Sequence, residues 1–255
     1  NDGQIGLEDT PDAFVAKLVD VFREVRRVLR DDGTLWLNLG DSYSGSGGAG
    51  NQFSDNGIAA SGVEAPSTYA DAKHKPPRKS TGLKPKDLIG IPWRVAFALQ
   101  ADGWYLRQDI IWHKPNPMPE SVRDRCTKAH EYVFLLSKNA KYYCDMDSVK
   151  EKSTGRTDCG ESEEGKRNKR SVWTVNTKPY KGAHFATFPP KLIEPCVLAG
   201  CPKGGTVLDP FGGSGTTAQV AINNGRNAVL CELNAGYIDI AQARIEKECS
   251  QGVML

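Results

Sequence analysis

Near the end of the chain, an apolar strand runs directly into a glycine-rich turn and then into a helix, at residues 207–217. Glycines in such a turn let a ligand approach the backbone without meeting Cβ atoms, and the start of the helix presents free N–H groups and the positive end of its dipole. This geometry is typical of α/β proteins that bind nucleotide-like ligands. The residues predicted to form the binding loop are Asp209, Pro210, Phe211, Gly212, Gly213, Ser214, Gly215, Thr216 and Thr217.

An acidic residue, Glu232, follows a second apolar strand at about the distance where a carboxylate meets ribose hydroxyls in Rossmann-type folds. The loop lacks the Gly-x-Gly-x-x-Gly spacing of dinucleotide-binding proteins and the Gly-Lys-Ser/Thr ending of a Walker loop, so NAD and nucleoside triphosphates are disfavoured. A cofactor with a ribose and no phosphates fits better, and S-adenosylmethionine (SAM) is the candidate. The alternative is a plain strand-to-helix turn without a ligand.

Composition excludes several classes of protein. The 255 residues are 39% hydrophobic and 25% charged with a net charge of +2, which is typical of one globular domain, with or without an insertion. No apolar run is long enough to span a membrane, and no secretory signal is present. The seven cysteines are scattered and form no Cys-x-x-Cys pair, so neither a disulfide framework nor a metal site is indicated. We therefore expect a cytoplasmic protein.

The spacing of apolar residues predicts the remaining elements of an α/β fold. Helices are expected at about 11–29, 88–100 and 236–247, and strands at 34–41, 104–112 and 131–137. Asp41 stands at the end of the first of these strands, where ligands bind in open α/β sheets. A ligand contact and a cap for the next turn are equally good interpretations of Asp41.

Two long polar segments and one stiff loop are candidates for contacts with a large substrate. Residues 42–86 form a long basic loop insertion, and residues 145–175 form a charged insertion suited to target recognition; a solvated excursion is the alternative for each. The loop that begins at Lys114 and Asn116 contains three prolines in five residues and is predicted to form a rigid pocket wall, with a plain exit loop as the alternative. Basic side chains on such segments suit phosphate contacts.

Taken together, these segments resemble the β-class of SAM-dependent DNA amino-methyltransferases, which methylate N6 of adenine or N4 of cytosine. The resemblance covers nearly the whole chain. It is carried by the motifs at 209–217, 232–234 with Tyr237, 184–189, 111–116 and 130–132, and by their order, with the SAM-binding half trailing the target-recognition segment. The fold implied for residues 1–255 is one Rossmann-like catalytic domain: a mostly parallel, twisted sheet of about seven strands, one of them antiparallel, with helices on both faces.

The resemblance also implies roles for individual residues. Glu232 binds the ribose of SAM, and the segment containing His184, Ala186, Thr187 and Phe188 holds the methionine end; Asn234 lies in the same site. The substrate implied is double-stranded DNA, bound by a monomer or a homodimer of restriction-modification or phage type. The residues expected to contact DNA are Lys73, Lys75, Arg78, Lys79, Lys114, Asn116, Arg167 and Arg170.

The sequence departs from the family at one motif. The catalytic element Asp/Ser/Asn-Pro-Pro-Tyr/Phe does not occur in these 255 residues, and Phe188-Pro189-Pro190 is no substitute because it lacks the preceding polar residue. We expect this element upstream of Asn1, so no catalytic residue is assigned. Three hypotheses stay open: a DNA amino-methyltransferase, a methyltransferase of another amine in RNA or protein, and a non-catalytic DNA- or SAM-binding remnant.

Overall fold

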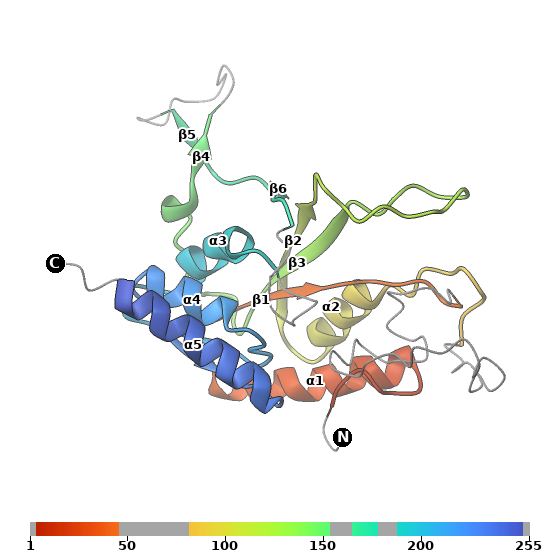
Figure 1. Ribbon diagram of the computed structural model, residues 1–255, viewed down its shortest axis with the longest axis horizontal. Coiled ribbons are helices and arrows are strands. Elements are labelled where there is room, and N and C mark those ends of the chain that lie inside the picture. The colour runs from red at the N-terminus through yellow and green to blue at the C-terminus, as the bar shows by residue number, and fades with distance from the viewer. Residues whose placement is uncertain (1–3, 46–81, 154–164, 178–187, 252–255) are drawn as a thin grey trace.

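The computed structural model describes residues 4–45, 82–153, 165–177 and 188–251. Figure 1 shows helices packed around a central sheet, with a small hairpin projecting from it. In chain order the elements are α1 (Pro11–Val28), β1 (Thr34–Leu39), α2 (Ile91–Ala101), β2 (Tyr105–His113), β3 (His130–Ser137), the 3-10 turn η2 (Asp147–Val149), β4 (Glu151–Lys152), β5 (Lys166–Arg167), β6 (Val172–Thr174), α3 (Pro190–Gly200), β7 (Thr206–Asp209), α4 (Thr216–Asn223), β8 (Asn227–Leu230) and α5 (Ala235–Gln251). No helix in the described part of the chain is long and apolar enough to cross a membrane.

The central sheet is mixed, which corrects the prediction of a mostly parallel sheet. Its strand order is β1-β3-β2-β6, and β3 runs antiparallel to both β1 and β2, whereas β6 is parallel to β2. No helix separates β2 from β3 in the chain, so β3 returns beside β2 in the opposite direction. A second, parallel pair joins β7 to β8. The count of about seven strands in one sheet stays a prediction. Within the described residues, hydrogen bonds join β1, β3, β2 and β6 into one sheet and β7 and β8 into another.

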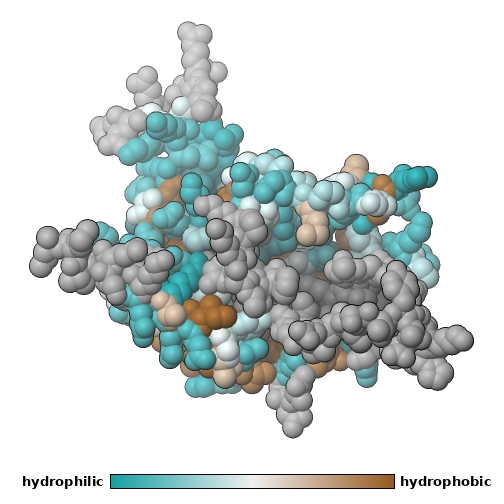
Figure 2. All heavy atoms as spheres, in the orientation of Figure 1, coloured by the Kyte–Doolittle hydropathy of each residue, from teal (hydrophilic) through white to brown (hydrophobic). Residues whose placement is uncertain are grey.

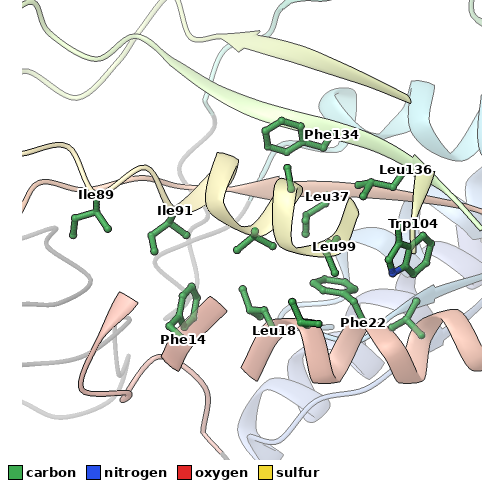
Figure 3. Packing of buried hydrophobic residues seen from close by; sticks show 14 residues of the cluster. Phe14, Leu18, Phe22, Leu37, Ile89, Ile91, Leu99, Trp104, Phe134 and Leu136 are labelled. Carbon is green, nitrogen blue, oxygen red and sulfur yellow. The ribbon is translucent and has the colours of Figure 1, made fainter. Parts of the chain in front are cut away.

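Helices α1 and α2 cover one face of this sheet. Thr10 caps α1 by accepting the Ala13 N–H at 3.1 Å, and Pro11 occupies the first helical turn as predicted. Figure 3 shows Phe14, Leu18 and Phe22 of α1 pointing toward α2 and the strands above it. They form the largest core together with residues that include Leu37, Leu99, Phe134 and Leu136. Alternate residues of β1 and β3 therefore point to this face.

Helix α3 covers the opposite face. Trp36, which precedes Leu37 in β1, packs there with Val133 of β3 and with Leu192 of α3. The same helix contacts the trailing half of the chain through Val197, which packs with Val220 of α4. The prediction of helices on both faces is therefore confirmed, and α3 joins the central sheet to the β7–β8 pair.

Asp41 caps the start of α2 across 50 positions of sequence. Its Oδ1 accepts the backbone N–H groups of Ser42 at 2.9 Å, Gly90 at 2.9 Å and Ile91 at 3.1 Å. The side chain is 5% exposed, and the Lys128 ammonium lies 3.8 Å from Oδ2. Of the two interpretations of this strand-end aspartate, the structure shows the cap.

Replacing Asp41 by alanine is expected to lower the free energy of unfolding by about 2–4 kcal/mol, because it orphans several N–H groups and leaves Lys128 without its partner. Urea denaturation measures the loss, and the affinity for SAM should not change. Asp12→Ala is the control, since Asp12 is 84% exposed and its ion pair with Arg94 should contribute about 1 kcal/mol or less. A loss no larger than that of the control would contradict the cap.

Candidate functional site

The glycine loop is tied together by Asp209 at the end of β7. Its Oδ1 accepts the Phe211 N–H at 2.9 Å, and its Oδ2 accepts the hydroxyl of Thr217 at 2.5 Å. The carboxylate thus joins the end of the strand to the first turn of α4. Residues 209–217 thus run from the end of β7 through the turn at Pro210 to Gly215 into the first turn of α4, as the sequence predicts, with Ser214 and Thr216 buried.

Two glycines of the loop adopt backbone conformations that favour glycine. Gly213 has φ 50° and Gly215 has φ 77°, both in the left-handed region. A Cβ on Gly215 would also lie 2.9 Å from Cβ of Ala241 in α5, and a Cβ on Gly212 would lie 2.9 Å from Cβ of Leu230. The loop is therefore pressed against both β8 and α5, and only glycine fits these positions without a shift.

The Glu232 carboxylate contacts the backbone of the glycine loop. Its Oε2 accepts the Gly213 N–H at 2.8 Å, and its Oε1 accepts the Asn234 N–H at 2.8 Å. Each carboxylate oxygen has a further lone pair, so the half-buried side chain can accept hydrogen bonds from two neighbouring hydroxyls while it stays fixed. Asn234 in turn accepts the Gly236 N–H at 2.9 Å and starts α5.

Apolar side chains stand beside this carboxylate. Leu233 is 71% exposed and Phe211 is 49% exposed, and the Phe211 ring meets that of Phe22 edge to face at 6.4 Å. A pair of acceptors next to exposed apolar surface suits a ribose that carries a flat ring. The loop contains no lysine or arginine that could meet a phosphate. The sequence analysis did not single out Leu233, although its place directly after Glu232 was available as a signal.

Arg244 of helix α5 forms hydrogen bonds with the end of the glycine loop. Its Nη1 donates to Oγ1 of Thr216 at 2.9 Å and to the carbonyl oxygen of Ser214 at 3.3 Å. This residue was not predicted, because 28 and 30 positions separate it from its partners. Arg244 fixes the point at which the turn becomes helix α4.

Replacing Arg244 by alanine is expected to weaken SAM binding by about 5- to 20-fold, because a charge-assisted hydrogen bond that holds the loop is lost. Isothermal titration calorimetry with SAM measures the change. Gln242→Ala is the matched control, since Gln242 is exposed on the same helix. Equal affinities of the Arg244 variant and the wild type would show that the loop holds its shape without α5.

The methionine end of the predicted cofactor site lies mostly outside the described residues. His184, Ala186 and Thr187 fall in the segment 178–187, which the structure does not describe. Phe188 is described, and it packs half-buried against the core between the sheet and α3. Its place just before α3 is the one that the sequence predicts.

Lys114 and Asn116, which were predicted to contact DNA, are already engaged within the protein. The Lys114 ammonium forms an ion pair with Glu131 and lies 4.3 Å from the centre of the Trp112 ring. Asn116 donates to the carbonyl oxygen of Thr177 at 3.2 Å and accepts the Thr177 N–H at 3.0 Å. Both side chains therefore hold the loop in place, and their contact with DNA stays a prediction.

Polar and charged groups from the carboxyl end of β1 and the start of β3 lie close to one another. Asn38 donates to Glu131 at 3.2 Å and to the Tyr132 carbonyl oxygen at 2.8 Å. Burial lowers the pKa of Lys128, although the charge of Asp41 opposes this shift. This is the edge of an α/β sheet at which ligands bind, so the cluster forms a partly buried polar floor there.

The second group of predicted DNA contacts lies on and beside the β4–β5 hairpin. Glu151 accepts the Nε hydrogens of Arg167 at 3.0 Å and Arg170 at 2.6 Å. Burial would raise the pKa of Glu151, but the hydrogen bonds from Arg170 and Arg167 hold it below its ordinary value. Figure 2 shows a largely hydrophilic surface on this projection. The other predicted contacts, Lys73, Lys75, Arg78 and Lys79, lie outside the described residues. No cluster of potential metal ligands occurs within the described ranges.

Comparison with known proteins places these features in a family. Residues 1–243 match the N6/N4 methyltransferase family model, described as DNA methylase. The chain is 52% identical to the Type II methyltransferase M.SmaI of Serratia marcescens over 245 residues, which are 96% of this chain and 78% of that protein. It is also 52% identical to the Type II methyltransferase M.Cfr9I of Citrobacter freundii, over 97% of this chain and 76% of that protein.

Solved structures show the same fold. The PvuII DNA methyltransferase (cytosine-N4-specific) aligns with a TM-score of 0.65 and 17% identity, over 98% of this chain and 79% of that one. The complex of M1.HpyAVI with SAM aligns with a TM-score of 0.55 and 17% identity, over 90% and 83% of the two chains. The predicted methyltransferase fold is thus confirmed, and the family match, with relatives at 52% identity, shows that this chain belongs to the N6/N4 DNA methylase family.

Proposed function

We propose that the protein transfers a methyl group from SAM to an exocyclic amine of a DNA base, N4 of cytosine or N6 of adenine, within a specific duplex sequence. Its relatives M.SmaI and M.Cfr9I are Type II methyltransferases, and a role in a restriction-modification system follows from that similarity. The chain acts as one catalytic domain, as a monomer or a homodimer in the cytoplasm.

The observation that supports this proposal is the pair of hydrogen bonds from backbone N–H groups that fixes the Glu232 carboxylate. With Gly213 and Asn234 holding its oxygens, the carboxylate can bind the two ribose hydroxyls of SAM, and Leu233 and Phe211 offer apolar surface to the adenine ring. When bound, SAM would supply the methyl group on its sulfonium sulfur: the S–CH₃ bond would break as the N–CH₃ bond forms, S-adenosylhomocysteine would leave, and the proton of the amine would pass to water. The predicted contacts of the methionine end are His184 and the segment 186–188.

The DNA side of the site is proposed from charge and position. The basic loop insertion at 42–86 and the charged insertion at 145–175 would contact the phosphate backbone and the target sequence, Arg167 and Arg170 among them. In Figure 1, the β4–β5 hairpin projects upward above α3, and the segment between β2 and β3 extends from the end of the sheet at the upper right. A duplex that docks between these projections meets the carboxyl end of β2.

The test is direct methylation of DNA. The full-length protein is incubated with plasmid DNA and SAM that carries a labelled methyl group, and the DNA is then hydrolysed to nucleosides for mass spectrometry. Labelled N4-methylcytosine or N6-methyladenine is the expected product, and its identity assigns the base. Label found only in RNA or protein offered in parallel would favour the alternative amine substrate, and SAM binding without any transfer would favour a non-catalytic protein.

A further inference from the structure

The segment between β2 and β3, residues 114–129, forms a projecting arm. The Lys114 N–H donates to the Ala129 carbonyl oxygen at 2.8 Å and closes its base. Figure 1 shows this β2–β3 arm reaching away from the end of the sheet. It starts at the carboxyl end of β2, where an α/β sheet binds its substrate. The arm therefore starts at the edge of the sheet where the proposed DNA substrate would bind.

The first side of the arm is stiff. Prolines at positions 115, 117 and 119 fix the φ angle at every second residue. Asn116 exchanges two amide hydrogen bonds with the Thr177 backbone, at 3.0 and 3.2 Å, and its carbonyl oxygen lies 3.4 Å from the Thr177 hydroxyl. This side is thereby fastened to the chain that follows β6.

The second side of the arm is fastened to the chain around β1 and α2. The Arg125 guanidinium lies 4.0 Å from the centre of the Tyr43 ring and forms an ion pair with Glu120. Lys86 forms an ion pair with Asp124 at 2.6 Å. The three prolines and the contacts on both sides restrict the conformations of the arm, so its residues lose less conformational entropy when they bind a partner.

The proline-rich side of the arm presents an apolar side chain to solvent. Met118, between Pro117 and Pro119, is 86% exposed, more than any other large apolar side chain that the structure describes. Val122, farther along the arm, is 36% exposed, and Arg123 next to it is also exposed. Figure 2 shows apolar residues among hydrophilic ones on this projection. A single exposed methionine is ordinary on a surface, but one between two prolines, on an arm that starts at the carboxyl end of β2, has the form of a wedge.

We propose that Met118 enters the duplex at the target base and occupies the space that the flipped base leaves. This inference rests on the proposed function. A methyltransferase must extrude its base, which loses stacking and pairing, and apolar side chains inserted between base steps offset part of that cost. Methionine suits the role because it is long, unbranched and polarisable, and Arg123 can meet a nearby phosphate.

The experiment compares two substrates. Each is a duplex with the recognition sequence, found by sequencing methylated plasmid DNA; one is fully paired and the other has an abasic site opposite the target base. For Met118→Ala in the full-length protein, kcat/KM should fall about 10-fold on the paired duplex and change by less than about twofold on the abasic one, whose target base is already unpaired. Met118→Leu and the arm control Val122→Ala should stay near the wild type on both.

The outcomes separate the inference from the function on which it rests. Wild-type kinetics of Met118→Ala on the paired duplex, or an equal loss on both duplexes, would overturn the wedge. Failure of the wild type to methylate either duplex would overturn the proposed function, and the inference with it. Thermal unfolding of Met118→Ala should match the wild type because the side chain is exposed.

Discussion

Replacing Glu232 by glutamine is expected to weaken SAM binding by about 10- to 100-fold. The substitution removes the charge that strengthens hydrogen bonds to ribose hydroxyls, each worth about 1.5–3 kcal/mol when one partner is ionised. It also turns one acceptor into an NH₂ donor. Since both oxygens of Glu232 accept backbone N–H groups, this donor must face either Gly213 or Asn234. The loss therefore combines a weaker cofactor contact with a loosened loop.

Isothermal titration calorimetry with SAM and with S-adenosylhomocysteine measures this loss. The two ligands share the nucleoside, so both should weaken by the same factor if Glu232 binds the ribose. Asp239→Asn is the control, because Asp239 is an exposed acid on α5 close in sequence to the site. An unchanged dissociation constant for the Glu232 variant would remove the ribose contact from the proposed site.

The second large effect is expected at Gly215. A left-handed conformation costs a non-glycine residue about 1–2 kcal/mol, and forcing an atom into a packed contact adds about 1–3 kcal/mol. Gly215→Ala meets both costs, because its φ is 77° and the new Cβ would lie 2.9 Å from Cβ of Ala241. The free energy of unfolding should fall by about 2–5 kcal/mol, and SAM binding should weaken as the loop shifts.

Gly204 offers a matched control for this prediction. Its φ is 74°, nearly that of Gly215, but an added Cβ would meet nothing within 4 Å. Gly204→Ala should therefore lose only the conformational part, about 1–2 kcal/mol, and should bind SAM normally. Urea denaturation of both variants separates the two costs. Equal losses would show that α5 yields to the added methyl group.

The local structure of the proposed cofactor site was predictable because its signals are local. The apolar strand, the glycines and the helix start between Val207 and Thr217 form one continuous stretch, and Glu232 follows the next strand along the chain. The spacing of the glycines and the lack of a Gly-Lys-Ser/Thr ending disfavoured NAD and triphosphate sites. In the structure, these residues form the strand, turn and helix that the pattern predicts. The structure also shows a hydrogen bond from the Gly213 N–H to the Glu232 carboxylate.

The substrate side was less predictable because its side chains find partners far away in sequence. A lysine on an exposed loop is a typical phosphate contact, yet the Lys114 ammonium forms an ion pair with Glu131, 17 positions later. Asn116 pairs with Thr177 across 61 positions, and Asp41 caps a helix that begins 50 positions later. No local pattern contains such pairs, since they form only when strands and loops have been brought together.

The sequence by itself determined the alternation of helices and strands, the SAM-type loop and the family resemblance, because periodicity, turn residues and motifs act over short stretches of chain. The tertiary structure alone decided three features. Strand β3 lies between β1 and β2, Arg244 of α5 forms a hydrogen bond with the end of the glycine loop, and the proline-rich arm exposes Met118 to solvent. Strand order and long-range contacts depend on how whole faces of helices and sheets pack, and the spacing of residues along the chain does not encode that choice locally.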